Sequence, residues 1–272
     1  MSKAYPPPPY PPTNLYQPQL QPQMPNQMPP QMAYLTQQQQ LQPQYQPQQQ
    51  VQQPQTNRFP TSFGFYRLGV KSASDLVIAL EKNDPNPLFL ISTHGVWSSK
   101  SSVILHSSNS KSSPPLATAN LHNFGSDMEV VLIGAGGGSA ETHVKKNGFG
   151  KGTLTFSAPV GAGMGGGIGI GGGGTEQFEW KSSHGEEVKG MDGKGHGMKL
   201  LRVGTGEVVA AWTPASSGRN KRGNMSFMGN RDVYGDAFEI IVVITIAGII
   251  EKRRRQKYSN WESVAVAGEL AG

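Results

Sequence analysis

The most constraining feature of the sequence is a short apolar run near its C-terminal end that basic residues follow at once. Residues 240–250 carry no charge, and residues 251–257 read Glu-Lys-Arg-Arg-Arg-Gln-Lys. Eleven residues form a helix of roughly 16 Å, whereas the hydrocarbon core of a bilayer needs about twenty residues. Extending the run backwards would place Glu239 and Asp236 in hydrocarbon, at about 2.5–3.5 kcal/mol for each carboxylate. A helix that is apolar on every side but too short to span a membrane is typical of a protein interior.

We therefore expect a core helix over residues 233–257, with the rest of the fold around it. Its buried side chains would be those of the apolar run and of the aromatic residue before it, namely Phe238, Ile240, Ile241, Val243, Ile244 and Ile246. The alternative is a single-pass membrane protein that is anchored by residues 233–250.

The N-terminal part of the chain differs sharply in composition from the rest. Residues 1–57 contain one formal charge, Lys3, together with most of the prolines and several runs of glutamine. Such a stretch cannot bury enough apolar surface to offset the entropy of ordering. We expect a disordered Pro/Gln-rich tail over 1–60, a folded domain over 61–257 and a flexible tail over 258–272. The opening residues lack the apolar segment of a secretory signal, and the chain has no cysteine, so we expect a cytoplasmic protein.

Short strand-like segments, each bounded by Gly, Ser, Asn or Pro, follow one another through the folded part. They are 63–70, 75–81, 88–91, 102–106, 116–121, 128–133, 177–182, 198–203 and 207–213. In 177–182, Phe178 and Trp180 alternate with charged residues, which is the pattern of a strand with one buried face. Roughly ten short strands and one apolar helix predict a mainly β fold, an antiparallel and closed barrel with the helix inside it.

Two segments carry a resemblance to a known superfamily. They are residues 199–213, Lys-Leu-Leu-Arg-Val-Gly-Thr-Gly-Glu-Val-Val-Ala-Ala-Trp-Thr, and residues 237–255, the apolar run with its basic end. Over about residues 63–257 the chain resembles the tubby C-terminal-like superfamily, which includes the LURP-one-related proteins and the phospholipid scramblases, and in particular its uncharacterised fungal members. The resemblance implies a twelve-stranded barrel around a hydrophobic C-terminal helix. It also implies contact with phosphoinositide or phospholipid rather than enzymatic activity.

Basic residues near the core helix are the candidates for binding lipid. Those on the expected loop before the helix and those after it are Arg219, Lys221, Arg222, Lys252, Arg253, Arg254, Arg255 and Lys257. Cations at a helix C-terminus also interact favourably with the helix dipole. Five cations within six residues are more than this interaction needs. Each cation near an anionic membrane contributes about 1 kcal/mol of attraction. We expect peripheral binding to anionic membrane lipid, and no nucleic-acid binding, because aromatic residues that would stack bases are missing nearby.

The tail contains one recognisable ligand motif. Pro7, Pro8, Pro9 and Tyr10 match the Pro-Pro-x-Tyr ligand of WW domains, and the preformed polyproline II shape lowers the entropic cost of binding. Chance occurrence in a tail rich in Pro and Tyr is the competing explanation. We expect the tail to recruit WW-domain proteins, and the alternative is a protein whose tail drives condensation.

The sequence shows no catalytic or metal-binding pattern. Residues 161–166 match the G-x-G-x-x-G pattern of dinucleotide sites, but further glycines replace the helix that such a site needs. The six histidines are scattered, without the spacing of metal ligands. A scramblase-like protein that moves lipid is a further alternative, although an acidic calcium-binding loop is not visible. We expect a monomeric, non-enzymatic domain without cofactor or metal.

Overall fold

The computed structural model describes residues 57–69, 74–95, 97–122, 127–134, 139–148, 152–161, 174–216 and 220–269, with side chains as far as Lys257. All of these belong to one compact unit, Gln52–Gly272. The Pro7–Tyr10 motif of the tail, Arg219 and most of the glycine tract lie outside the described residues.

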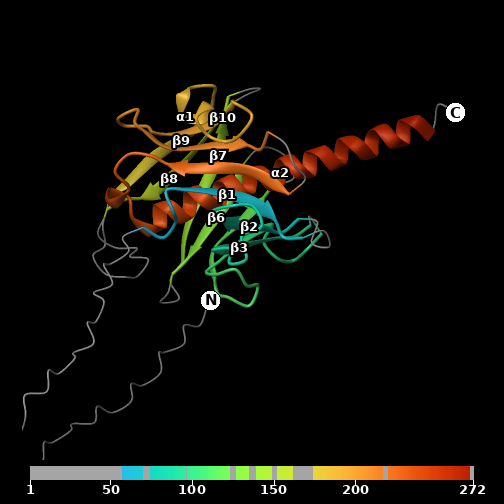
Figure 1. The fold of residues 1–272 in the computed structure, drawn as a ribbon, viewed down its shortest axis with the longest axis horizontal. Coiled ribbons are helices and arrows are strands. Elements are labelled where there is room, and N and C mark those ends of the chain that lie inside the picture. Colours follow the sequence, from blue (N-terminus) through green and yellow to red (C-terminus); the bar gives the residue numbers. More distant parts are fainter. Residues whose placement is uncertain are drawn as a thin grey trace, which may run out of the picture. The chain divides into compact units, whose positions relative to one another are not determined.

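The described strands form a closed antiparallel barrel in which each strand pairs with its neighbours in sequence (Figure 1). The barrel closes where β1 pairs with β12. The strands are β1 (Ser62–Arg67), β2 (Leu76–Ala79), β3 (Phe89–Thr93), β4 (Val103–His106), β5 (Pro115–Leu121), β6 (Met128–Ile133), β7 (Ser139–Asn147), β8 (Thr153–Pro159), β9 (Thr175–Ser183), β10 (Gly197–Arg202), β11 (Val208–Pro214) and β12 (Lys221–Phe227). A short helix, α1 (Glu186–Lys189), lies between β9 and β10. The predicted fold class is therefore confirmed, with twelve strands in the described part of the chain.

Alternating burial along the strands creates the inner wall of the barrel. In β6 the side chains of Met128, Val130 and Leu132 are buried, while those between them are partly exposed. The expected alternation in β9 is present, because Phe178 and Trp180 are both fully buried. One face of each such strand therefore contributes to a single apolar cluster that also includes the helix.

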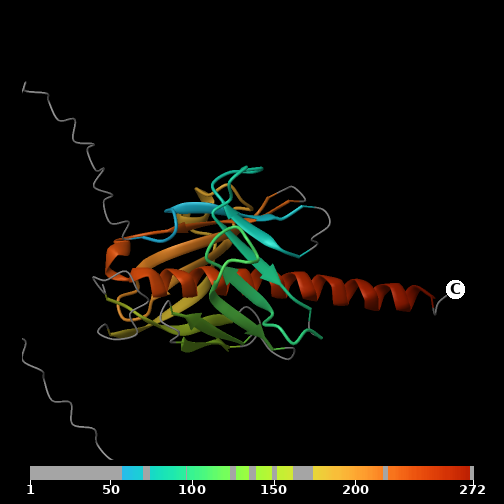
Figure 2. The same cartoon turned by 90° about the horizontal axis from the view of Figure 1, so that it is seen from below.

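The helix α2 (Gly235–Glu269) runs through the barrel and continues beyond it (Figure 2). All of the predicted core residues are at most 1% exposed: Phe238, Ile240, Ile241, Val243, Ile244 and Ile246. The helix packs against β4, β5, β6 and β8. It comes close to β6 at Gly248, where an added Cβ would lie 2.9 Å from the Sδ atom of Met128. Among the described helices, none combines the length and the apolar character that a membrane span requires.

The ends of the folded region differ from the prediction. Residues 57–60 were expected in the tail, but Phe59 is only 2% exposed and packs into the apolar cluster. The helix begins at Gly235 rather than at residue 233, after a short 3-10 helix, η1 (Arg231–Val233). The backbone is helical as far as Glu269, where a flexible tail was expected. Extending an existing helix needs no new nucleation, and residues 258–269 contain no proline to stop it.

Three strands were not predicted individually, and one of them corrects the placement of two candidate residues. Lys221 and Arg222 were expected on a loop but belong to β12, in which Gly223, Met225 and Phe227 are buried in alternation. The inward side chains make this segment a strand, although it begins with two cations and a glycine. β7 and β8 were the other two omissions, and in β7 only Val144 is buried.

Candidate functional site at the exit rim

The candidate basic residues of α2 emerge at one end of the barrel, which we call the exit rim. It is defined by His94, Leu121, Met128, Met198 and Trp212, which contact the last buried turns of α2 or the residues that follow them. The helix passes from fully buried residues to exposed Lys257 over this rim. Segment 251–257 has five cations against the single carboxylate of Glu251.

The carboxylate of Glu251 is buried at the exit rim and accepts hydrogen bonds from two arginines. Glu251 is 1% exposed. Arg254 donates to its two oxygens from Nε at 2.6 Å and from Nη2 at 2.7 Å, and Arg255 donates from Nε at 2.8 Å. These partners lie three and four residues further along the helix, which places all three side chains on one helix face. We call this arrangement the Glu251 cluster.

The remaining arginine of the helix packs on the barrel wall. The guanidinium carbon of Arg253 lies 4.7 Å from the centre of the Trp212 ring, and its Nη2 atom lies 3.9 Å from the Sδ atom of Met198. Met198 and Trp212 face each other across β10 and β11. The contact with Trp212 has cation–π geometry, so Arg253 and Arg255 both contact the barrel wall, at Trp212 and at the carbonyl of His94.

The lysines of the candidate set differ from one another in their exposure. Lys257 is exposed, and so is Arg253. Lys252 is partly buried, and burial lowers the pKa of its ammonium group while Asp127 raises it. Lys221 donates to Asp192 at 2.6 Å and lies 5.8 Å from the centre of the Tyr66 ring.

β12 begins at the same end of the barrel as the helix exit. A Cβ added at Gly223 would lie 2.6 Å from Nε1 of Trp212, the ring on which Arg253 packs. The described candidates of β12 and of α2 are therefore all placed at the exit rim.

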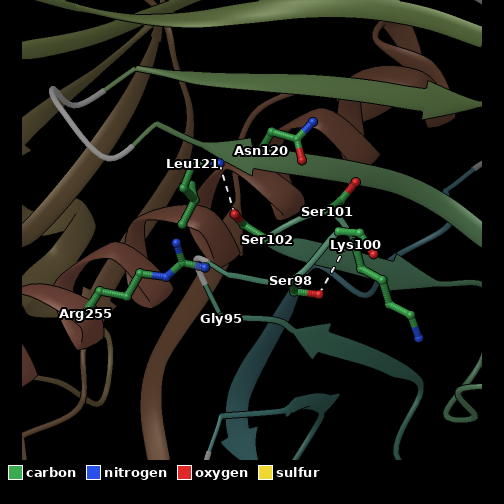
Figure 3. Close-up of a pocket in the computed structure, with 9 residues that line it drawn as sticks. Gly95, Ser98, Lys100, Ser101, Ser102, Asn120, Leu121 and Arg255 are labelled. Carbon is green, nitrogen blue, oxygen red and sulfur yellow. Dashed lines mark hydrogen bonds between the residues drawn. The ribbon is translucent and has the colours of Figure 1, made fainter.

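A pocket of about 290 Å³ opens beside the Glu251 cluster (Figure 3). Its wall is formed mainly by residues 98–102, Ser-Ser-Lys-Ser-Ser, with Gly95, Asn120, Leu121 and Arg255. The guanidinium of Arg255 points toward Ser102, whereas the side chain of Lys100 points away from Arg255. The hydroxyl of Ser102 accepts the backbone N–H of Leu121 at 3.3 Å and keeps its own proton to donate. One guanidinium beside several hydroxyl donors is an arrangement that suits a small anionic group.

The loop that carries these serines is fixed at its base. His94 and Ser102 are joined by a backbone hydrogen bond of 3.0 Å, and the ring of His94 bonds to the carbonyl of Ser101 at 3.0 Å. Arg255 donates from Nη2 to the carbonyl of His94 at 2.6 Å. The loop and the helix exit are thus tied together by the residue that points into the pocket.

A second buried carboxylate lies at the other end of the apolar run of α2. Glu239 is 1% exposed and is paired with Arg231. It also accepts the backbone N–H groups of Arg58 and Phe59 at 3.0 and 3.2 Å. Burial raises the pKa of the Glu239 carboxyl more than Arg231 and the two N–H groups lower it. Its contribution to stability is therefore greatest below the ordinary pKa of glutamate and is lost as the pH rises through the raised value.

Sequence reasoning missed the Glu251 cluster, the pocket and the exposed Trp97 beside it. The spacing of Glu251 from Arg254 and Arg255 was a usable signal, since the three lie at i, i+3 and i+4. The pocket had no such signal, because its loop and Arg255 are far apart in the sequence.

Comparison with known proteins identifies no relative of this chain. No family model matches it, and neither the curated proteins nor the solved structures include a match. Within the described residues, no group of three or more His, Asp or Glu side chains could hold a metal ion. The resemblance to the tubby C-terminal-like superfamily stays a prediction.

Proposed function

We propose that this protein is a non-enzymatic, cytoplasmic barrel protein that binds anionic membrane lipid peripherally through its exit rim. The observation that supports this most strongly is the pocket at the exit rim, where the hydroxyl groups of residues 98–102 lie beside the guanidinium of Arg255. Phosphate groups of lipids are anions that accept several hydrogen bonds, and Arg and Ser side chains supply such donors. The resemblance to a superfamily that contacts phospholipid supports the same class of ligand.

The lysines and the arginines contribute to this function in different ways. Arg254 and Arg255 offset the charge of Glu251, and Arg255 also bonds to the base of the pocket loop. Exposed Lys257 and partly buried Lys252 add attraction to an anionic surface, at about 1 kcal/mol for each cation near the membrane. Because this attraction acts at the surface, salt screens it within a Debye length of about 10 Å at 0.1 M.

Neutralising Lys257 is expected to weaken binding to anionic vesicles about fivefold at low salt, which corresponds to about 1 kcal/mol. The measurement is co-sedimentation of the full chain with phosphatidylcholine vesicles that contain phosphatidylserine, and the variant is Lys257→Gln. Lys82→Gln is the matched control, since Lys82 is also exposed but lies beyond β2 at the other end of the barrel. Adding Lys252→Gln to Lys257→Gln should weaken binding further. If wild-type protein does not bind these vesicles even at low salt, the proposal is wrong.

The tail motif gives a separate partner prediction. Tyr10→Ala should abolish capture by an isolated WW domain, because the tyrosine anchors the Pro-Pro-x-Tyr motif in its groove. Tyr45→Ala is the control, since Tyr45 lies in the same tail but does not follow two prolines in that pattern. A pull-down with both variants decides the question. Equal capture of the two variants would refute the specific motif and leave only general recognition of proline.

A further inference from the structure

Trp97 is unusually exposed for its size and lies on the loop that forms the pocket. Its exposed fraction is 98%, whereas the other exposed large apolar residues of the described chain range from 39% to 61%. It directly precedes Ser98, whose hydroxyl accepts the N–H of Lys100 at 3.1 Å. The backbone N–H of Ser98 donates to the carbonyl of Gly95 at 3.0 Å, which forms a turn at the tip of the loop. The loop thus presents the indole to the surroundings from a base that is tied to α2 through His94 and Arg255.

A single exposed apolar residue needs no explanation by itself. The position of Trp97, next to cations at the exit rim, nevertheless suggests a function for its exposure. Indole has a large apolar body and one N–H donor, and tryptophan is enriched where a bilayer meets water. Lys100 lies three residues away on the same loop and is exposed, and Arg255 of α2 contacts His94 at the base of the loop. An aromatic residue at the tip and cations behind it match the apolar and anionic layers of a bilayer surface.

We propose that Trp97 inserts into the interfacial layer of an anionic bilayer and that the β3–β4 loop, rather than the β9–β10 loop across the rim, is the part of the barrel wall that the bilayer contacts. This proposal rests on the lipid binding proposed above and specifies its geometry.

The course of α2 is the reason for contact on one side. Its backbone continues as a helix for twelve residues after Lys257, or about 18 Å. A bilayer therefore cannot approach the exit rim along the helix axis. It can approach from the side, where the exposed Trp97 of the β3–β4 loop lies.

The order of strands places a matched loop on the opposite side of the barrel. In the closed barrel the β3–β4 pair and the β9–β10 pair are separated by the same number of strands in both directions. The loop between β9 and β10 lies at the exit rim too, since Met198 at the start of β10 contacts Arg253. It carries exposed Lys194, as the β3–β4 loop carries exposed Lys100. Lys100 and Lys194 therefore lie on opposite sides of the exit rim, and both are exposed.

The test uses fluorescence of the full chain bound to phosphatidylcholine–phosphatidylserine vesicles whose acyl chains are brominated, because bromine quenches an indole that enters the bilayer. All proteins carry Trp261→Phe, so that Trp97 and the fully buried Trp180 and Trp212 remain. We expect quenching with Trp97 present and none in the Trp97→Ser variant. Trp97→Ser should also bind about tenfold more weakly, as expected for loss of a partly buried aromatic side chain. Its thermal unfolding should not change, because the residue makes almost no internal contacts.

The lysine pair tests the direction of approach with the same vesicles. Lys100→Gln should weaken binding about fivefold, whereas Lys194→Gln should leave it unchanged. Equal losses from the two variants would overturn contact on one side. Binding to anionic vesicles without quenching of Trp97 would overturn the insertion while the proposed lipid binding stands. Failure of the wild-type chain to bind these vesicles would overturn both proposals.

Discussion

Replacing Arg254 and Arg255 together with glutamine is expected to lower the free energy of unfolding by about 3–5 kcal/mol, because the carboxylate of Glu251 would stay buried without a cation. The carboxylate is 1% exposed and accepts three N–H groups from these two side chains. Two amides can replace part of the hydrogen bonding but none of the charge. The measurement is urea unfolding of the full chain followed by circular dichroism, with the same slope required of both proteins.

Two further variants separate this explanation from a general loss of arginine contacts. Adding Glu251→Gln to the double variant removes the buried charge and should restore most of the lost stability, because the cost comes from the uncompensated carboxylate. Arg253→Gln serves as the control, since it removes only a contact with Trp212 worth about 0.5–1 kcal/mol at an exposed site. A double variant within 1 kcal/mol of wild type, or no recovery with Glu251→Gln, would contradict the proposed role of the cluster.

The structural contacts of the arginines determine which variants can test lipid binding. From the sequence, the three arginines and the lysines of 252–257 are equivalent candidates. In the structure the arginines are bound to Glu251 and Trp212, so a triple arginine variant would lose stability and lipid attraction together. Lys257 and Lys100 make cleaner probes, because both are exposed.

The core of the fold could be predicted because its signal is local. An apolar run of eleven residues is too short to span a bilayer and must be buried inside the protein, and the interior of a barrel can enclose it. Strands such as β9 show their alternation directly, with Phe178 and Trp180 on one face. Of the omitted strands, β7 lacks this signal, since it buries only Val144, whereas β8 carries it in Leu154, Phe156 and Ala158 and could have been predicted. β12 begins with two cations and a glycine, which together favour a loop.

The site could be predicted only in part because its contacts are not local. The cations after the apolar run indicated an anionic partner. Nothing in the sequence showed which of these cations would instead contact other residues of the protein. That depends on Glu251 being buried, which follows from where the barrel wall ends rather than from neighbouring residues. The contact between Arg255 and His94 spans 161 positions, and no periodic pattern specifies such a pairing. The charge of Glu239 is likewise offset by Arg231 and by backbone groups of residues 58 and 59.

Replacing Ile244 with aspartate is expected to prevent stable folding of the domain. Ile244 is fully buried in the stretch of α2 between Glu239 and Glu251. Those two carboxylates are paired with arginines, whereas a carboxylate at position 244 would be surrounded by the apolar cluster. Burying it would cost several kcal/mol even if it takes up a proton, which is a large part of the 5–15 kcal/mol that stabilises a typical domain. The variant should therefore accumulate as aggregate, or unfold well below the melting temperature of the wild-type chain.

Two controls show whether the position or the aspartate is responsible. Val233→Asp introduces the same charge into a residue that is 46% exposed, and it should change the free energy of unfolding by less than about 0.5 kcal/mol. Ile244→Val keeps the site apolar and removes one methylene group, which typically costs about 0.5–1.5 kcal/mol. Solubility after expression and circular dichroism of the soluble fraction rank the three variants. A soluble and fully folded Ile244→Asp protein would mean that the barrel does not enclose this segment of α2. Inside a closed barrel the carboxylate would have neither water nor a cation to offset the cost of its burial.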